Sequence, residues 1–90
     1  MIYDISSSIG NDGTTIGPIT ATRNMTIQIT GEAGTITGAI SVDGETFTDM
    51  DTYSFTGPTE TFDIVVGTNG TVIQLTTTGT FSAAYLIKED

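Results

Sequence analysis

The stretch Thr35–Phe47 constrains the fold most, because its side chains alternate regularly between two classes. An extended chain places successive residues on opposite faces, so this period of two predicts a strand with one buried face. The face expected to be buried carries Ile36, Gly38, Ile40 and Val42, and the opposite face carries Thr35, Thr37, Ala39 and Ser41. The stretch therefore predicts the first strand of a β-hairpin.

The residues after this strand predict how the hairpin turns. Asp43 and Gly44 tolerate the positive φ that a two-residue type I′ turn requires. Such a turn would pair Ile40 with Phe47 on the buried face. It would also bring Asp49 into the core, so we expect the pairing to break or bulge after Phe47.

Residue choice along the whole chain also favours strands. Twenty Thr and eleven Gly stand against five Ala, two Leu and one Lys, and Thr suits a pleated surface whereas Gly weakens helices. Turn signals recur about every eight to twelve residues. We therefore expect an all-β fold, an antiparallel β-sandwich of seven to eight short strands, immunoglobulin-like or jelly-roll-like. The expected strands lie within 1–5, 19–29 (one bent strand or two), 35–42, 53–55, 62–66, 72–78 and 81–87, with a loop at 49–52.

Five aromatic residues are expected in the core, because each lies on the apolar face of its own strand. They are Phe47, Phe55, Phe62, Phe81 and Tyr85. A ninety-residue chain without cysteine has a small core and no disulfides to support it. We therefore expect it to gain stability from a partner or from copies of itself, as a homo-oligomer.

The chain is expected to divide into an N-terminal arm or loop, residues 1–17, and a sandwich domain, residues 18–90. Residues 6–17 are rich in turn formers and poor in apolar residues, so we expect either a partner-ordered arm or a disordered terminus. The apolar side chains of the arm are candidate partner-binding residues: Ile2, Tyr3, Ile5 and Ile9.

The net charge excludes two classes of partner. Eleven acids stand against Arg23 and Lys88, giving a charge of -9. Binding to nucleic acid or to an anionic membrane needs Lys and Arg, so neither partner is expected. The start of the chain has no basic segment followed by an apolar run, so we expect synthesis in a cytoplasm.

The composition also argues against catalysis and cofactors. Histidine and cysteine are absent, so the usual general bases and thiol nucleophiles are missing, and we expect no enzyme activity, no cofactor and no metal site. Four acids within nine residues suggest calcium as an alternative, which the sequence leaves open: Asp43, Glu45, Asp49 and Asp51. Their spacing does not match an EF-hand and favours acids in a turn and loop.

Two segments resemble small β-sandwich structural proteins of tailed-bacteriophage virions. Those proteins often carry Ser-x-Asp-Gly-x-Thr-aromatic at a hairpin and Gly-Thr-aromatic at the start of the closing strand. Here Ser41–Phe47 and Gly79–Phe81 occupy these places. The resemblance implies a capsid decoration (cement) protein, or an accessory of the head, neck or tail. Its implied location is the virion, and its implied partners are the major capsid protein or other virion proteins.

A binding module is the rival interpretation. A carbohydrate- or receptor-binding domain of a tail fibre or an extracellular protein would present aromatic rings to its ligand. Tyr3 and Tyr53 are the candidates, and Arg23 is a further candidate partner-binding residue. An immunoglobulin-like module of a larger assembly is a third interpretation.

Overall fold

The computed structural model describes residues 2–22, 24–65, 68 and 70–88. In this part of the chain the regular elements are strands, together with one 3₁₀ turn, η1 (Ser6–Ser8). The strands are β1 (Ile2–Asp4), β2 (Thr15–Thr20), β3 (Asn24–Gly31), β4 (Gly34–Ser41), β5 (Thr48–Phe55), β6 (Thr59–Val65), β7 (Val72–Thr77) and β8 (Phe81–Lys88).

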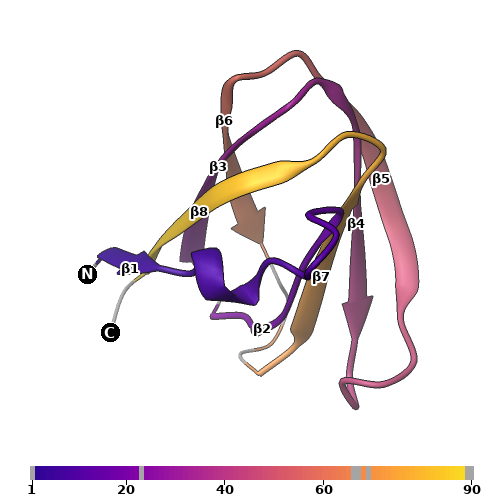
Figure 1. Cartoon of the computed structure of the whole chain (residues 1–90). Helices are drawn as coiled ribbons and strands as arrows, with labels where there is room; N and C mark the ends of the chain where they lie inside the picture. Colours follow the sequence, from indigo (N-terminus) through magenta and orange to yellow (C-terminus); the bar gives the residue numbers. More distant parts are fainter. Residues whose placement is uncertain (1, 23, 66–67, 69, 89–90) are drawn as a thin grey trace.

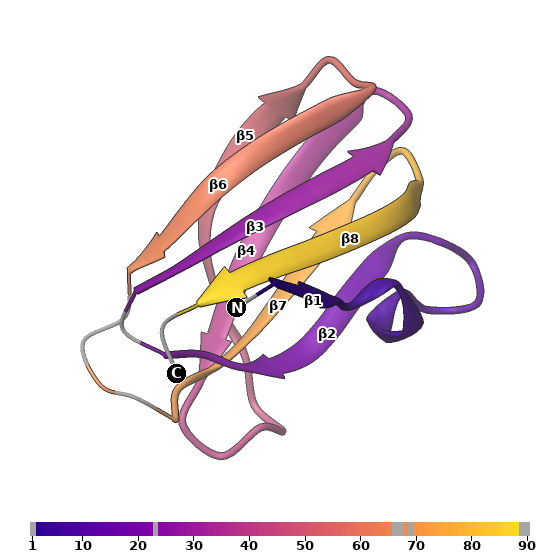
Figure 2. The same ribbon diagram turned by 90° about the vertical axis from the view of Figure 1, so that its left-hand side faces the viewer.

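These strands form two four-stranded sheets that pack face to face (Figures 1 and 2). The first sheet has the order β1-β8-β3-β6, and the second has the order β2-β7-β4-β5. Every pairing between named strands is antiparallel. The predicted antiparallel β-sandwich is therefore confirmed.

The core lies between the sheets and is built mainly from isoleucine. On β3 the buried side chains are Met25, Ile27 and Ile29, which alternate with polar residues as a strand with one buried face requires. The second sheet contributes Ile16, Ile36 and neighbours on β7. Burying an Ile side chain contributes roughly 1.5–3 kcal/mol, so these β-branched residues are the main source of stability.

The N-terminal residues lie within the sandwich. β1 pairs with β8, and the Ile5 N–H donates a hydrogen bond to the Ala84 carbonyl at 2.9 Å. Ile9 forms a β-bridge with Ile16, whose side chain is fully buried. The boundary expected after residue 17 falls inside β2, so residues 2–17 are part of the domain rather than a separate arm.

Two strands differ from the sequence-based prediction. Residues 49–52, expected to be a loop, belong to β5, which pairs with β4 over eight residues with one register shift. Its side chains are almost all exposed because β5 is the edge of its sheet, so no apolar alternation marked it. The shift lies between Thr37 and Ala39. A break or bulge was predicted directly after Phe47, where the pairing with β4 instead begins, at Thr48.

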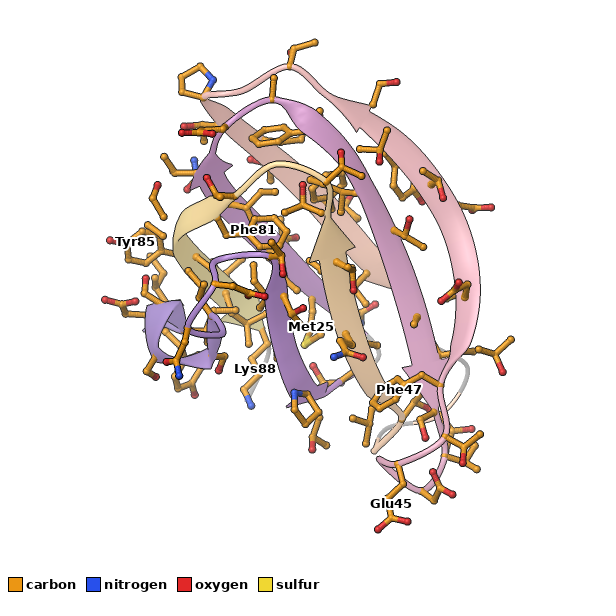
Figure 3. The ribbon with its side chains drawn as sticks, turned by 45° about the vertical axis from the view of Figure 1, so that its right-hand side comes forward. Met25, Glu45, Phe47, Phe81, Tyr85 and Lys88 are labelled. Carbon is orange, nitrogen blue, oxygen red and sulfur yellow. The ribbon has the colours of Figure 1, made fainter. Side chains whose placement is uncertain are left out.

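On β8 a bulge reverses the expected faces. Thr30 pairs with Ala83 and Gly31 pairs with Phe81, so Ser82 is an extra residue in β8. Beyond it Ala84 and Leu86 face the core, and Tyr85 is 42% exposed. Figure 3 shows Tyr85 pointing away from the sandwich. The prediction of a core Tyr85 was wrong. Of the other four predicted core aromatics, Phe55 and Phe81 are buried, and Phe47 and Phe62 are half-buried.

The β4–β5 hairpin turns through a six-residue loop, residues 42–47, instead of the predicted two-residue turn. A type I′ turn needs positive φ at both central residues, and among the described residues only glycines have it, Gly44 at 78° included. Ile40 consequently pairs with Thr48, not Phe47. The Asp43 carboxylate oxygen Oδ1 accepts hydrogen bonds from three donors, the Ser41 hydroxyl at 2.7 Å and the N–H groups of Glu45 at 2.9 Å and Thr46 at 3.0 Å.

The Asp43 carboxyl group in this loop should titrate at unusually low pH. The N–H groups of Thr46 and Glu45, followed by the Ser41 hydroxyl, stabilise the carboxylate and lower the pKa of Asp43 to about 2. Because the folded pKa lies below the unfolded value of about 4, the stabilisation is fully present above about pH 4 and is lost as the pH falls toward 2. We expect the Glu45 and Thr46 amide resonances to shift with a midpoint near 2 in an NMR titration, and Asp43→Asn to abolish that step. A midpoint near 4 would contradict the hydrogen bonding.

Candidate functional site

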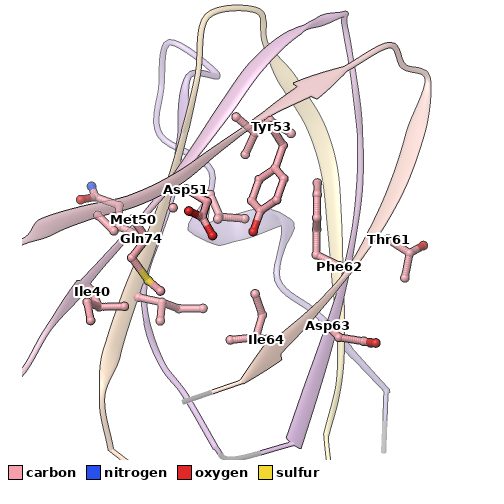
Figure 4. Close-up of a pocket in the computed structure, with 14 residues that line it drawn as sticks. Ile40, Met50, Asp51, Tyr53, Thr61, Phe62, Asp63, Ile64 and Gln74 are labelled. Carbon is pink, nitrogen blue, oxygen red and sulfur yellow. The ribbon is translucent and has the colours of Figure 1, made fainter. Parts of the chain in front are cut away.

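An apolar groove lies between β5 and β6 in the described part of the chain (Figure 4). These strands are the edges of the two sheets on the same flank of the sandwich. The groove has a volume of about 450 Å³, within the usual range of ligand pockets. Its lining residues are Ile36, Gly38, Ala39, Ile40, Met50, Asp51, Tyr53, Thr61, Phe62, Asp63, Ile64, Ile73, Gln74 and Leu75.

The floor of the groove is the inner surface of the second sheet. Ile36 on β4 and Ile73 and Leu75 on β7 are buried there. On the opposite side Phe62 and Ile64 of β6 are half-buried and pack against the same core. The groove therefore continues the interior of the sandwich outward, at the flank where no further strand closes it.

A bulge and a glycine account for the open volume. Thr37 pairs with Thr52 and Ala39 pairs with Asp49, so Met50 and Asp51 together lie opposite Gly38. A Cβ placed on Gly38 would meet only the Leu75 Cδ2 atom, at 3.8 Å. The missing side chain at this position leaves space at the centre of the groove.

Polar groups gather at the mouth of the groove. The Tyr53 ring, 48% exposed, packs against the Phe62 ring with centroids 5.6 Å apart and an interplanar angle of 43°. Figure 4 shows the Tyr53 hydroxyl and the Asp51 carboxylate on the same side of the hollow. Asp63 points away from it and accepts a hydrogen bond from the Thr26 hydroxyl at 2.9 Å. Of the two carboxylates in the lining, Asp51 faces the hollow, and the lining has neither Lys nor Arg. The groove therefore favours a cationic group beside an apolar body.

The candidate partner-binding residues divide between two places. Tyr53 lies in the groove. Ile2 lies on β1, at the far edge of the first sheet, and is 71% exposed. Tyr3 is half-buried, with the Lys88 amine 5.0 Å from its ring centroid, an arrangement typical of a cation–π contact.

The remaining candidates offer less surface. Ile5 and Ile9 are half-buried and pack against the core cluster. Their apolar character therefore serves the fold of this chain. Arg23 lies outside the described residues.

The four acids considered for calcium are not gathered into one site. Among the described residues, no group of three or more acidic side chains is placed to hold a metal ion. Asp43 Oδ1 is surrounded by hydrogen-bond donors, whereas Asp51 lies in the groove. In the same part of the chain no helix has the length and apolar character that crossing a membrane requires.

Comparison with known proteins gives no relative to guide the assignment. No protein-family model matches the chain, and no curated protein or solved structure matches it significantly. Function must therefore be argued from the residues of this chain.

The groove was not predicted from the sequence. It depends on the pairing of β5 with β4 and on β5 and β6 lying on the same flank, and both are long-range features. One signal was present: Asp49 could not share a regular register with Gly38, which indicated a bulge near the position where Asp51 now borders the groove.

Filling the groove at Gly38 should stabilise the fold. Gly38 has an ordinary φ and open space beside it, and replacing a mid-strand Gly by Ala is worth roughly 0.5–1 kcal/mol. We expect Gly38→Ala to raise the free energy of unfolding by about that amount in urea denaturation. Gly34→Ala on the same strand is the control, because its Cβ would lie 2.7 Å from both the Gly79 nitrogen and the Thr78 hydroxyl oxygen. This variant should destabilise. A destabilising Gly38→Ala would show that the space is not open.

Proposed function

We propose that the chain is a non-enzymatic structural protein of a tailed-bacteriophage virion, a capsid decoration protein that binds and stabilises the outer capsid surface. Support comes from the resemblance at Ser41–Phe47 and Gly79–Phe81 and from the all-β sandwich. A decoration protein is a passive subunit present in many copies, which needs a binding surface rather than a reactive centre. The major capsid protein is the proposed partner, with self-association into a homo-oligomer on the particle.

The observation that carries the proposal is an exposed apolar surface at the β1 edge. We define this β1 surface as Ile2, Tyr85 and Ile87. Ile2 pairs directly with Ile87, and the two side chains are 71% and 48% exposed. Tyr85, 42% exposed, lies two residues along β8. An edge strand with adjoining apolar side chains is typical of a surface that another protein covers.

The rival function, a carbohydrate- or receptor-binding module, is favoured by one observation. Tyr53 exposes about half of its surface beside a groove of ligand size, and aromatic rings in such places stack on sugars. A glycan array separates the two functions, since strong selective binding by the purified chain would favour the module.

Capsid binding should depend on the β1 surface. We expect the protein to co-sediment with virions purified from the phage that encodes it, and Ile2→Asp to lower its copy number about tenfold, because a carboxylate would be buried without a partner. Val42→Asp is the matched control: Val42 is 95% exposed, in the β4–β5 loop, and the copy number should stay unchanged. Both variants should keep the melting temperature of the native chain, because both sites are exposed. Virions without the protein would show the proposal to be wrong, and equal occupancy by both variants would exclude the β1 surface.

A further inference from the structure

We propose that the groove between β5 and β6 binds an extended segment of a different polypeptide, which adds to the free edge of β6 as a new strand. The segment carries apolar side chains at alternate positions and a Lys or Arg near Asp51. The proposal goes beyond capsid decoration and does not depend on it. The groove and the β1 surface lie at opposite edges of the first sheet.

The edge of β6 is suited to strand addition. β6 pairs with β3 through seven consecutive residue pairs without a register shift, and its other side has no strand neighbour in the described part of the chain. A regular edge presents its unpaired N–H and C=O groups at the spacing that another strand needs. β5, the other border, is interrupted by its bulge opposite Gly38, and bulges disfavour edge pairing. We therefore assign the incoming strand to β6.

The apolar lining and volume of the groove determine which side chains the segment carries at alternate positions. Every second side chain of a strand added to β6 would face the same way as Phe62 and Ile64, toward the second sheet and the open flank of the groove. Interiors are normally packed to the density of organic crystals, so an open apolar volume of about 450 Å³ loses contacts that an occupant would restore. The volume of the groove corresponds to a few aliphatic side chains, which is the number that alternate residues of one short strand would supply.

The acidic side chains around the groove determine the polar half of the segment, and they exclude a second copy of this chain as the occupant. Asp51 borders the hollow, and β6 itself carries Glu60 and Asp63. Two copies joined through their β6 edges would bring these acids together, in chains that each carry a net charge of -9. Like charges on adjacent strands are destabilising. A segment that carries Lys or Arg instead pairs with these acids, and the opposite charges raise its rate of association.

A small amphiphilic amine also fits the lining but uses less of the site. It would satisfy the apolar floor and Asp51 while leaving the β6 edge unpaired. Strand addition uses both features, with main-chain hydrogen bonds giving affinity and alternate side-chain contacts giving selectivity. The peptide is therefore the favoured occupant, and the amine is an outcome of the test.

The test is a selection from a displayed library of random peptides about ten residues long, the upper length of common strands. The target is the full chain, and Gly38→Val serves as the counter-target, because its side chain would occupy part of the hollow. We expect enriched peptides with alternating apolar residues and Lys or Arg, binding Gly38→Val at least about tenfold more weakly than the native chain. The Cβ of Gly38→Val meets only the Leu75 Cδ2 atom, at 3.8 Å, so we expect the variant to keep the circular-dichroism spectrum and melting temperature of the native chain. These two measurements show that lost binding does not reflect unfolding.

Two further measurements distinguish strand addition to β6 from other ways in which a peptide could bind the groove. Asp51→Asn should weaken binding in a salt-dependent way. Asp49→Asn on the same strand, outside the lining, should change it little. On binding, the backbone amides of β6 should gain protection from hydrogen exchange, whereas those of β1 should not.

Several outcomes would overturn the proposal. Enriched peptides that are acidic or unpatterned would do so, as would peptides that bind Gly38→Val equally well or protect β5 instead of β6. Dodecylamine binding that is sensitive to Gly38→Val, with no peptide enriched, would assign the groove to a small amphiphile. None of these results bears on capsid occupancy, which the Ile2→Asp variant tests at the other edge of the sheet.

Discussion

The structure depends on the burial of β-branched side chains between two sheets. The chain contains no cysteine, so the packing of a core cluster that includes Ile16, Ile27, Ile29 and Ile36 must hold the layers together. These residues alternate with polar ones on their strands, and each sheet consequently has one apolar face and one polar face. The layers close well where bulky side chains meet from both sides. At the β5–β6 flank, Gly38 supplies no side chain and the bulge in β5 moves the edge of the sheet, which leaves the groove.

The sequence predicted the strands that cross the core, because there the hydrophobic pattern and the burial agree. β3 and β7 are examples. On β4 the agreement is partial: Ile36 is buried as predicted, but Ala39 and Ser41 of the opposite face are also buried, and Val42 is 95% exposed. The prediction failed at strands whose sequence of apolar and polar residues is not determined by burial. β5 is exposed along nearly its whole length and resembles a polar loop. On β8 the extra residue Ser82 exchanges the two faces, and no local residue choice distinguishes a bulged strand from a regular one. Asp43-Gly44 fits a short turn by propensity, but the hydrogen bonds of Asp43 and Ser41 favour a longer loop.

The site was harder to predict than the fold for a related reason. The polar composition of the N-terminal segment predicts that Ile5 and Ile9 are available to a partner, whereas η1 and β2 bring them against the core of the same chain. Ile2 remained exposed because β1 is short and lies at the edge of its sheet. Tyr53 was selected as an isolated ring for stacking, whereas it packs on Phe62 across the gap between the sheets. Each difference reflects a contact between residues distant in sequence, which residue type and spacing do not encode.

The acidic charge connects the edge strands with the proposed partners. A sandwich with open edges is at risk of pairing with copies of itself, and carboxylates on β5 and β6 oppose that pairing. The same carboxylates attract a strand that carries positive charge, so one arrangement both disfavours self-association at this flank and favours a basic partner there. At the β1 edge the exposed side chains Ile2 and Ile87 are apolar, and β1 carries a single acid, Asp4. The two edges of the first sheet therefore differ in chemistry, as the two proposed binding partners require.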